Sequence, residues 1–272
     1  MLLRINSTSF SFITAVLAMA IHFSSVDAGH YDVVPYATGT GPGAKILTGA
    51  YDDLAELPTL QNLRVYGYDF GELVPNVADA PGFNNASSFT SGVFANDGKL
   101  PAGGLTLSVL PGAYGALHYW DGTGQASFAP VSGGIEINVA QDHSSINSNL
   151  RVGGSSTSGS LLIWNITGSG AAAGRVHQHL ESGIGVGGNG LSFTTSGAPD
   201  GIYAFGATLS VGGLTSDPIY FVFNQGMTEA IHDEGIDFYS AHVVPEPSSI
   251  ALAGLGVAGL AGAALRRRMR KQ

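Results

Sequence analysis

The chain has 272 residues, of which 40 are glycine, and only 11% are charged. Its 20 acidic residues outnumber its 11 basic ones, which gives a net charge of -9, and cysteine is absent. A negatively charged surface repels phosphate backbones, and a chain without thiols has no disulfides, thiolate zinc fingers or cysteine nucleophiles. The composition therefore predicts one globular domain that does not bind nucleic acid.

The first 28 residues are typical of a secretory signal peptide. Arg4 precedes an apolar run, residues 12–21, and small residues lead to a cleavage point after Ala28. A buried N-terminal helix is the alternative. We expect signal peptidase to cut after Ala28, so that the exported chain begins at Gly29.

Residues 29–242 are expected to form the body of the protein. Short apolar segments alternate with clusters of Gly, Ser, Asn and Asp, and residues 135–140 alternate apolar and polar side chains as a half-buried strand does. Only residues 228–239 have helical periodicity. The pattern predicts an all-β fold, an antiparallel β-sandwich of about eight strands with one short helix. The expected strands are residues 62–70, 105–110, 117–120, 135–140, 161–167, 191–195, 202–211 and 219–224.

The strongest local signal in the body is the pair His177 and His179. On an extended segment, side chains two residues apart point to the same side, so both imidazoles can approach one zinc, copper or nickel ion. Two histidines do not complete a zinc site, which takes four ligands, so other ligands must come from elsewhere in the fold. The alternative is a pair of solvated histidines without a metal. Other available ligands are His30, Asp32, His118, His143, His232, Asp233, Glu234 and His242.

Signals for other chemistry are weak. The sequence has no G-x-S-x-G elbow and no phosphate-binding loop, so we expect no enzyme activity. Asp69 and Glu72 are possible calcium ligands, but the spacing of an EF-hand loop is absent. Exposed aromatic side chains could form a glycan-binding platform, but in a sandwich they are more often core residues.

The C-terminal end is predicted to be a sorting segment. A short linker, residues 243–249, contains Pro245, Glu246 and Pro247, and an apolar stretch follows at residues 250–265. As a helix, this stretch would reach about 24 Å, slightly less than the ~30 Å hydrocarbon core of a membrane. We expect it to be a transmembrane helix.

A basic tail, residues 266–272, follows the apolar stretch and includes Arg266, Arg267 and Arg268. By the positive-inside rule the tail stays in the cytoplasm, and the body lies outside the inner membrane. The order of Pro-Glu-Pro, apolar helix and arginine cluster resembles the PEP-CTERM segment of bacterial surface proteins that exosortases process. An ordinary tail anchor with a chance Pro-Glu-Pro is the alternative.

The body is similar to the surface domains called choice-of-anchor M. The resemblance lies in residues 29–33, 52–53, 177–179, 200–203 and 217–224. Some relatives occur beside metal-uptake transporters, so the resemblance implies a metal-binding surface protein. Together with ligand chemistry it predicts a zinc site with His177, His179 and His30 as ligands. The fourth ligand is a carboxylate such as Asp32, another histidine or water, and His118 and His232 are in reserve.

Two functions therefore remain open. The first is an exported protein, anchored in the membrane or processed by exosortase, that binds a divalent transition metal such as zinc and serves a metal-uptake system. The second is a structural or adhesive matrix protein that binds biofilm polysaccharide and has no metal role.

Overall fold

The computed structural model describes residues 31–52, 57–71, 74–85, 98–111, 115–141, 150–154, 159–186 and 197–243. Within these ranges the chain forms seventeen strands and one helix, α2 (Glu229–His242). The strands are arranged in three sheets of the described chain. The fold is therefore mostly β, as predicted.

The central sheet is the largest of the three. Its strand order is β12 (Ser160–Ile166), β7 (Gly103–Val109), β15 (Gly201–Val211), β17 (Ile219–Gln225) and β4 (Val65–Asp69). The short strands β8 (His118–Trp120) and β16 (Leu214–Thr215) also pair with β15, and β9 (Ala129–Pro130) pairs with β8. β17 and β4 run parallel, and the other pairs in this sheet are antiparallel.

Two smaller sheets complete the β structure. The first, called the histidine sheet here, has the order β13 (His177–His179), β6 (Gly82–Asn84), β1 (Tyr31–Ala37), β2 (Ile46–Asp52) and β3 (Leu57–Gln61). The second, the side sheet, has the order β11 (Leu150–Gly153), β10 (Ile135–Ala140), β14 (Glu181–Val186) and β5 (Val77–Ala78). β1 and β6 run parallel.

The main core lies between the central sheet and the two smaller sheets. Phe205 and Phe221 of the central sheet belong to the same buried cluster as Phe83 of the histidine sheet and Ile137 of the side sheet. All four side chains are fully buried. Because burying one such side chain stabilises a fold by about 1.5–3 kcal/mol, this layer supplies most of the apolar stabilisation.

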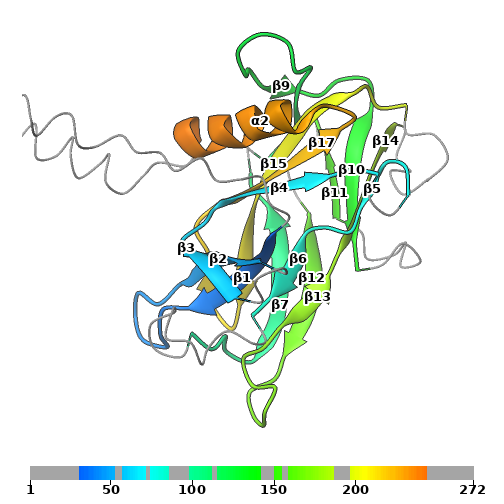
Figure 1. Ribbon diagram of the computed structural model, residues 1–272. Helices are drawn as coiled ribbons and strands as arrows, with labels where there is room; N and C mark the ends of the chain where they lie inside the picture. The colour runs from blue at the N-terminus through cyan, green and yellow to red at the C-terminus, as the bar shows by residue number, and fades with distance from the viewer. Residues whose placement is uncertain are drawn as a thin grey trace, which may run out of the picture.

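The other face of the central sheet is covered by α2 (Figure 1). Ala204 and Val222, which alternate along their strands with residues of the main core, pack with Ile236 and Tyr239 of the helix. At Gly235 an added Cβ would lie 2.9 Å from Ile202 Cγ2. The glycine that interrupts the helical pattern in the sequence thus lets the helix approach the sheet closely.

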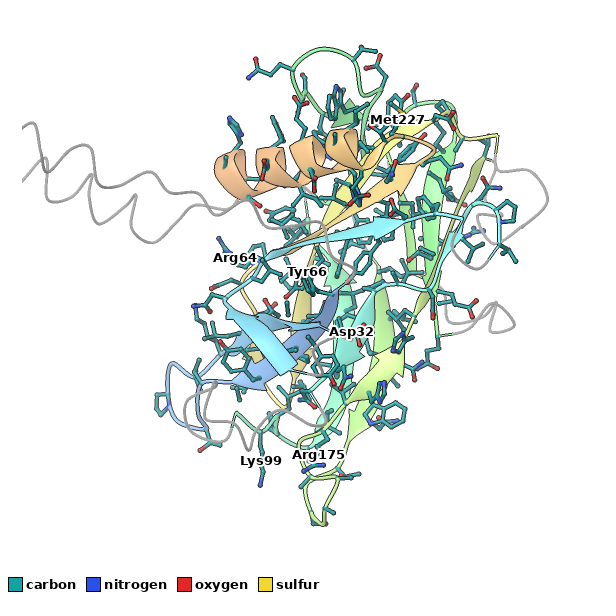
Figure 2. The ribbon with its side chains drawn as sticks, viewed as in Figure 1. Asp32, Arg64, Tyr66, Lys99, Arg175 and Met227 are labelled. Carbon is teal, nitrogen blue, oxygen red and sulfur yellow. The ribbon has the colours of Figure 1, made fainter. Side chains whose placement is uncertain are left out.

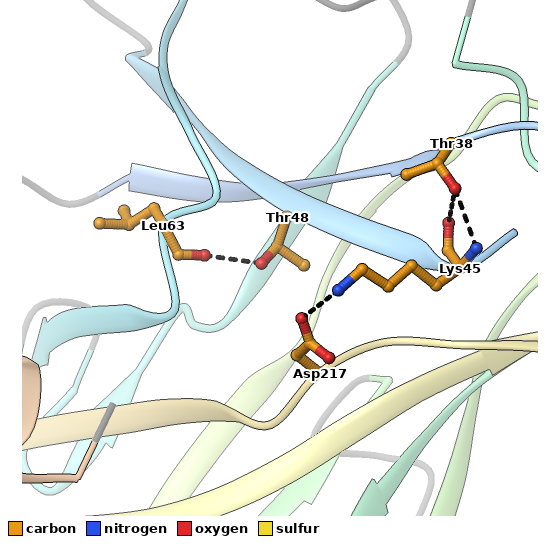
Figure 3. A network of polar contacts seen from close by, with 5 residues as sticks. All are labelled: Thr38, Lys45, Thr48, Leu63 and Asp217. Carbon is orange, nitrogen blue, oxygen red and sulfur yellow. Dashed lines mark hydrogen bonds and ion pairs between the residues drawn. The ribbon is translucent and has the colours of Figure 1, made fainter. Parts of the chain in front are cut away.

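Polar contacts also connect the histidine sheet to the central sheet (Figure 3). Lys45, just before β2, donates a hydrogen bond of 2.6 Å to Asp217, which precedes β17. Thr48 on β2 donates a 2.6 Å bond to the carbonyl of Leu63, which precedes β4. These contacts fix the ends of strands that belong to different sheets.

The structure corrects several details of the predicted sandwich. The described residues contain about twice as many strands as expected, in three sheets instead of two, and two strand pairs are parallel. Residues 150–153, which lie in none of the expected strands, form β11, and the helix continues three residues beyond the predicted end at residue 239. Short strands that pair with distant parts of the chain leave little local signal in the sequence, which explains why the sequence predicts too few strands.

The expected signal peptide, residues 1–28, and the segments from residue 244 onward lie outside the described residues, as does the strand expected at residues 191–195. In the described part of the chain, no helix combines the length and apolar character needed to cross a membrane.

Candidate metal site at the histidine strand

His177 and His179 lie on the short strand β13, as the sequence predicts. β13 is at the end of the strand order of the histidine sheet and pairs with β6, with His179 opposite Gly82. The centroids of the two imidazole rings are 5.6 Å apart. The extended backbone thus holds both rings near each other at the sheet edge.

Asn85, the residue after β6, fixes the start of the histidine strand. Its side chain is fully buried and accepts a 2.7 Å hydrogen bond from the backbone N–H of Val176. Its amide group donates bonds of 3.0 Å to the carbonyl of Pro35 and 3.1 Å to that of Gly174. One buried amide therefore connects the residue before His177 to β1 and to the preceding loop.

The ring of His179 lies between two carboxylates. Its Nε2 is 3.7 Å from Oδ2 of Asp32, and its Nδ1 is 3.8 Å from Oδ2 of Asp79. Two ligands that bind one zinc ion at about 2.1 Å are roughly 3.4 Å apart in tetrahedral geometry. The separation of His179 and Asp32 is therefore close to that of two atoms on one ion.

Asp32 is buried in the protein interior. Only 5% of the residue is exposed, and Figure 2 places it toward the middle of the molecule. A Cβ on Gly82 would collide with the Asp32 carboxylate, so the glycine makes room for this side chain beside β13. Burial, with a further contribution from the Asp32 charge, raises the pKa of Tyr68 well above its ordinary value. The carboxylate thus lies in surroundings of low polarity, where an attracted cation is held more strongly than in water.

The other predicted ligands do not join this group. His118 lies on β8 of the central sheet, where its Nδ1 donates a 2.9 Å hydrogen bond to the carbonyl of Ala116. His232 lies on α2, on the other face of the central sheet, and is fully buried there. His30 and His143 are outside the described residues. The structure brings Asp32 and Asp79 to the ring of His179, with His177 next to it on the strand, and places the two reserve histidines elsewhere. In the described residues, these side chains do not form a group of three ligand atoms that all lie within 4.8 Å of one another.

Sequence reasoning missed Asp79 and Asn85. Asp79 lies between β5 and β6, and it reaches His179 because β6 pairs with β13. No local pattern marks either residue, since their roles depend on pairing between segments far apart in the sequence.

Comparison with known protein families finds a match at the C-terminal end of the chain. Residues 243–268 match the PEP-CTERM protein-sorting motif. The chain therefore carries the sorting motif of exosortase substrates. The motif implies export and processing at the membrane, and the match includes Pro245, Glu246, Pro247 and the arginines 266–268.

No curated protein and no solved structure matches the chain. The motif match begins at residue 243, so the likeness of the body to choice-of-anchor M domains stays an expectation from the sequence.

Proposed function

We propose that this exported protein binds a divalent transition metal, with zinc as the best chemical match, at a site built on His179 and Asp32, to which His177 of the same strand adds a further ligand when the metal binds. The observation that carries the proposal is the 3.7 Å approach of His179 Nε2 to the buried Asp32 carboxylate. The expected role is to scavenge or store the metal outside the inner membrane.

The arrangement around His179 suits a metal ligand. Metal-binding histidines usually direct their second ring nitrogen toward a carboxylate or carbonyl, which fixes the tautomer. Asp79 lies on the Nδ1 side, and it favours a proton there, which leaves the Nε2 lone pair directed toward Asp32. His177 supplies a second imidazole on the same strand, and water or His30 is the expected fourth ligand.

Isothermal titration of the full chain in detergent with zinc tests the site. We expect a His177→Ala/His179→Ala variant to lose one zinc-binding event that the wild type has. His242→Ala removes an exposed histidine that bonds only to its own helix in the described structure, and it serves as the control. Equal zinc binding by the wild type and the double variant would exclude the histidine strand.

The anchoring arrangement is also a proposal. Exosortase is expected to recognise Pro245-Glu246-Pro247, with residues 250–265 as the membrane anchor and the arginine tail in the cytoplasm. Mass spectrometry of the surface-exposed protein tests this arrangement. Recovery of chains intact to Gln272 from cells with an active exosortase would contradict it.

A matrix role is the second candidate, and one observation favours it. Leu162 and Trp164 on β12 are 43% and 41% exposed, although large apolar side chains are usually covered. If this strand contacts polysaccharide, Trp164→Ala should release the protein from isolated matrix while zinc chelation should not. Unchanged matrix binding by Trp164→Ala would remove the support for this role.

A further inference from the structure

The histidine on α2 has an unusual environment. His232 is fully buried, and its Nε2 lies 3.1 Å from the carbonyl oxygen of Val222 on β17. A carbonyl oxygen only accepts hydrogen bonds, so Nε2 carries the hydrogen. In the neutral ring, Nδ1 then has the lone pair, and Nδ1 makes no hydrogen bond.

Two carboxylates face this buried nitrogen. Oδ1 of Asp69 is 3.4 Å from His232 Nδ1. Glu229 completes a group in which one ligand atom from each residue lies within 4.8 Å of the others, and the described residues contain no second group of this kind. A lone pair directed at carboxylate oxygens is repulsive unless a cation lies between them, and a buried polar atom without a partner costs about 1–3 kcal/mol.

The fold holds these three residues in place. Glu229 and His232 are three residues apart on α2, which puts both on one side of the helix. Asp69 is the last residue of β4, paired with Asn224 of β17. An added Cβ at Gly67 would lie 3.2 Å from Cε1 and Nε2 of His232, so the glycine allows the imidazole to lie against the strand.

We propose that Asp69, Glu229 and His232 form a second metal site, which binds a divalent transition metal such as zinc and fastens the first turn of α2 to β4. One imidazole nitrogen with two carboxylates suits zinc, whereas calcium and magnesium prefer oxygen ligands alone. Glu229 is exposed, so water can take the remaining coordination position on the solvent side.

This site is separate from the histidine strand. Asp32 lies toward the middle of the molecule, whereas Met227, just before α2, lies near its upper end in Figure 2. The helix also packs on the face of the central sheet opposite the main core. The site on α2 therefore has a structural role, independent of any metal uptake at His177 and His179.

Zinc titration of full-length variants tests the site. The starting protein is His177→Ala/His179→Ala, which retains only the α2 site and is expected to bind one zinc ion. Adding Glu229→Gln should weaken this binding by about tenfold or more, the lower range seen when a metal site loses a supporting group. Asp237→Asn, an acid-to-amide change at an exposed position on the same helix, is the control and should leave the affinity unchanged.

Glu229→Gln alters an exposed side chain, so a loss of binding does not reflect a broken core. Asp69→Asn should also weaken binding, and amide exchange in α2 should slow with zinc in the starting protein but not in this variant. The site would be overturned if the starting protein bound no zinc, or if it bound zinc with equal affinity with and without Glu229→Gln. In that case a proton on Nδ1 of His232, and not a metal ion, would face Asp69. Displacement of zinc by equimolar calcium would overturn the assignment to a transition metal.

The two metal proposals fail in different ways. Loss of all zinc in His177→Ala/His179→Ala would leave the histidine strand as the binding site and refute the site on α2. If that variant kept all the zinc that the wild type binds, and adding Glu229→Gln removed it, the site on α2 would be supported and the histidine strand would be refuted.

Discussion

Replacing Asn85 by alanine should destabilise the body and loosen the histidine strand together. The change removes three buried hydrogen bonds, to Val176, Pro35 and Gly174. At about 1 kcal/mol for each bond, the free energy of unfolding should fall by about 3 kcal/mol. For a domain of 150–250 residues this corresponds to a fall in Tm of roughly 6–12 °C.

Thermal unfolding followed by circular dichroism measures the loss. Asn85→Asp keeps the acceptor for the Val176 N–H but loses both donors and buries a charge, so its Tm should fall at least as far at pH 7.5. Asn165→Ala, at an exposed position, should change stability by less than about 0.5 kcal/mol. Amide exchange at Val176 and His177 should accelerate more than exchange in β17. A Tm for Asn85→Ala within 2 °C of the wild type would refute this account of the buried amide.

Three other predictions concern charge and pH. Lys45→Met should lower the free energy of unfolding, measured with urea, by less than about 1 kcal/mol. Both side chains of the Lys45–Asp217 pair are 44% exposed, so water weakens their attraction. A larger loss would contradict this, because it would mean that water does not screen the pair. Burial raises the pKa of Tyr66 and of Tyr203, so these phenols stay neutral in the folded protein. The contribution of the two phenols to the free energy of unfolding should be constant below about pH 10 and fall above it, and phenolate absorbance at about 295 nm that appears near pH 10 without unfolding would contradict this. Burial lowers the pKa of His118, so its contribution to stability should be present above about pH 6.5 and lost as the pH falls, and NMR titration showing an ordinary or raised pKa for this ring would contradict the structure.

The sequence predicts elements whose pattern is local. Residues 135–140 alternate as expected and form β10, and the extended pair His177 and His179 forms β13. β1 was missed, because Pro35 interrupts its apolar run and its pairing partners come from β2 and β6. Strands of two or three residues such as β5 and β6 are too short to show any periodicity.

The ligand groups show the same limit. The spacing of His177 and His179 is visible in the sequence, and so is Asp32 as a possible ligand. Beside His232, the sequence offers Asp233 and Glu234 as available carboxylates. The helix instead places Glu229 beside it, and strand pairing brings Asp69 from far away in the chain. The sequence therefore indicates His232 as a possible ligand but does not show that Glu229 and Asp69 are the carboxylates beside it.

The position of β17 affects how the protein folds during export. β17, residues 219–225, lies between β15 and β4, although β4 is formed from residues 65–69. When a chain crosses a membrane from its N-terminus, β17 emerges after most of the body. Until then, the edges of β4 and β15 that pair with β17 are unpaired and can bind strands of other chains. Pairing over such distances is also slow. The sorting motif begins at residue 243, directly after α2, so β17 emerges shortly before the motif at which the exported chain is processed.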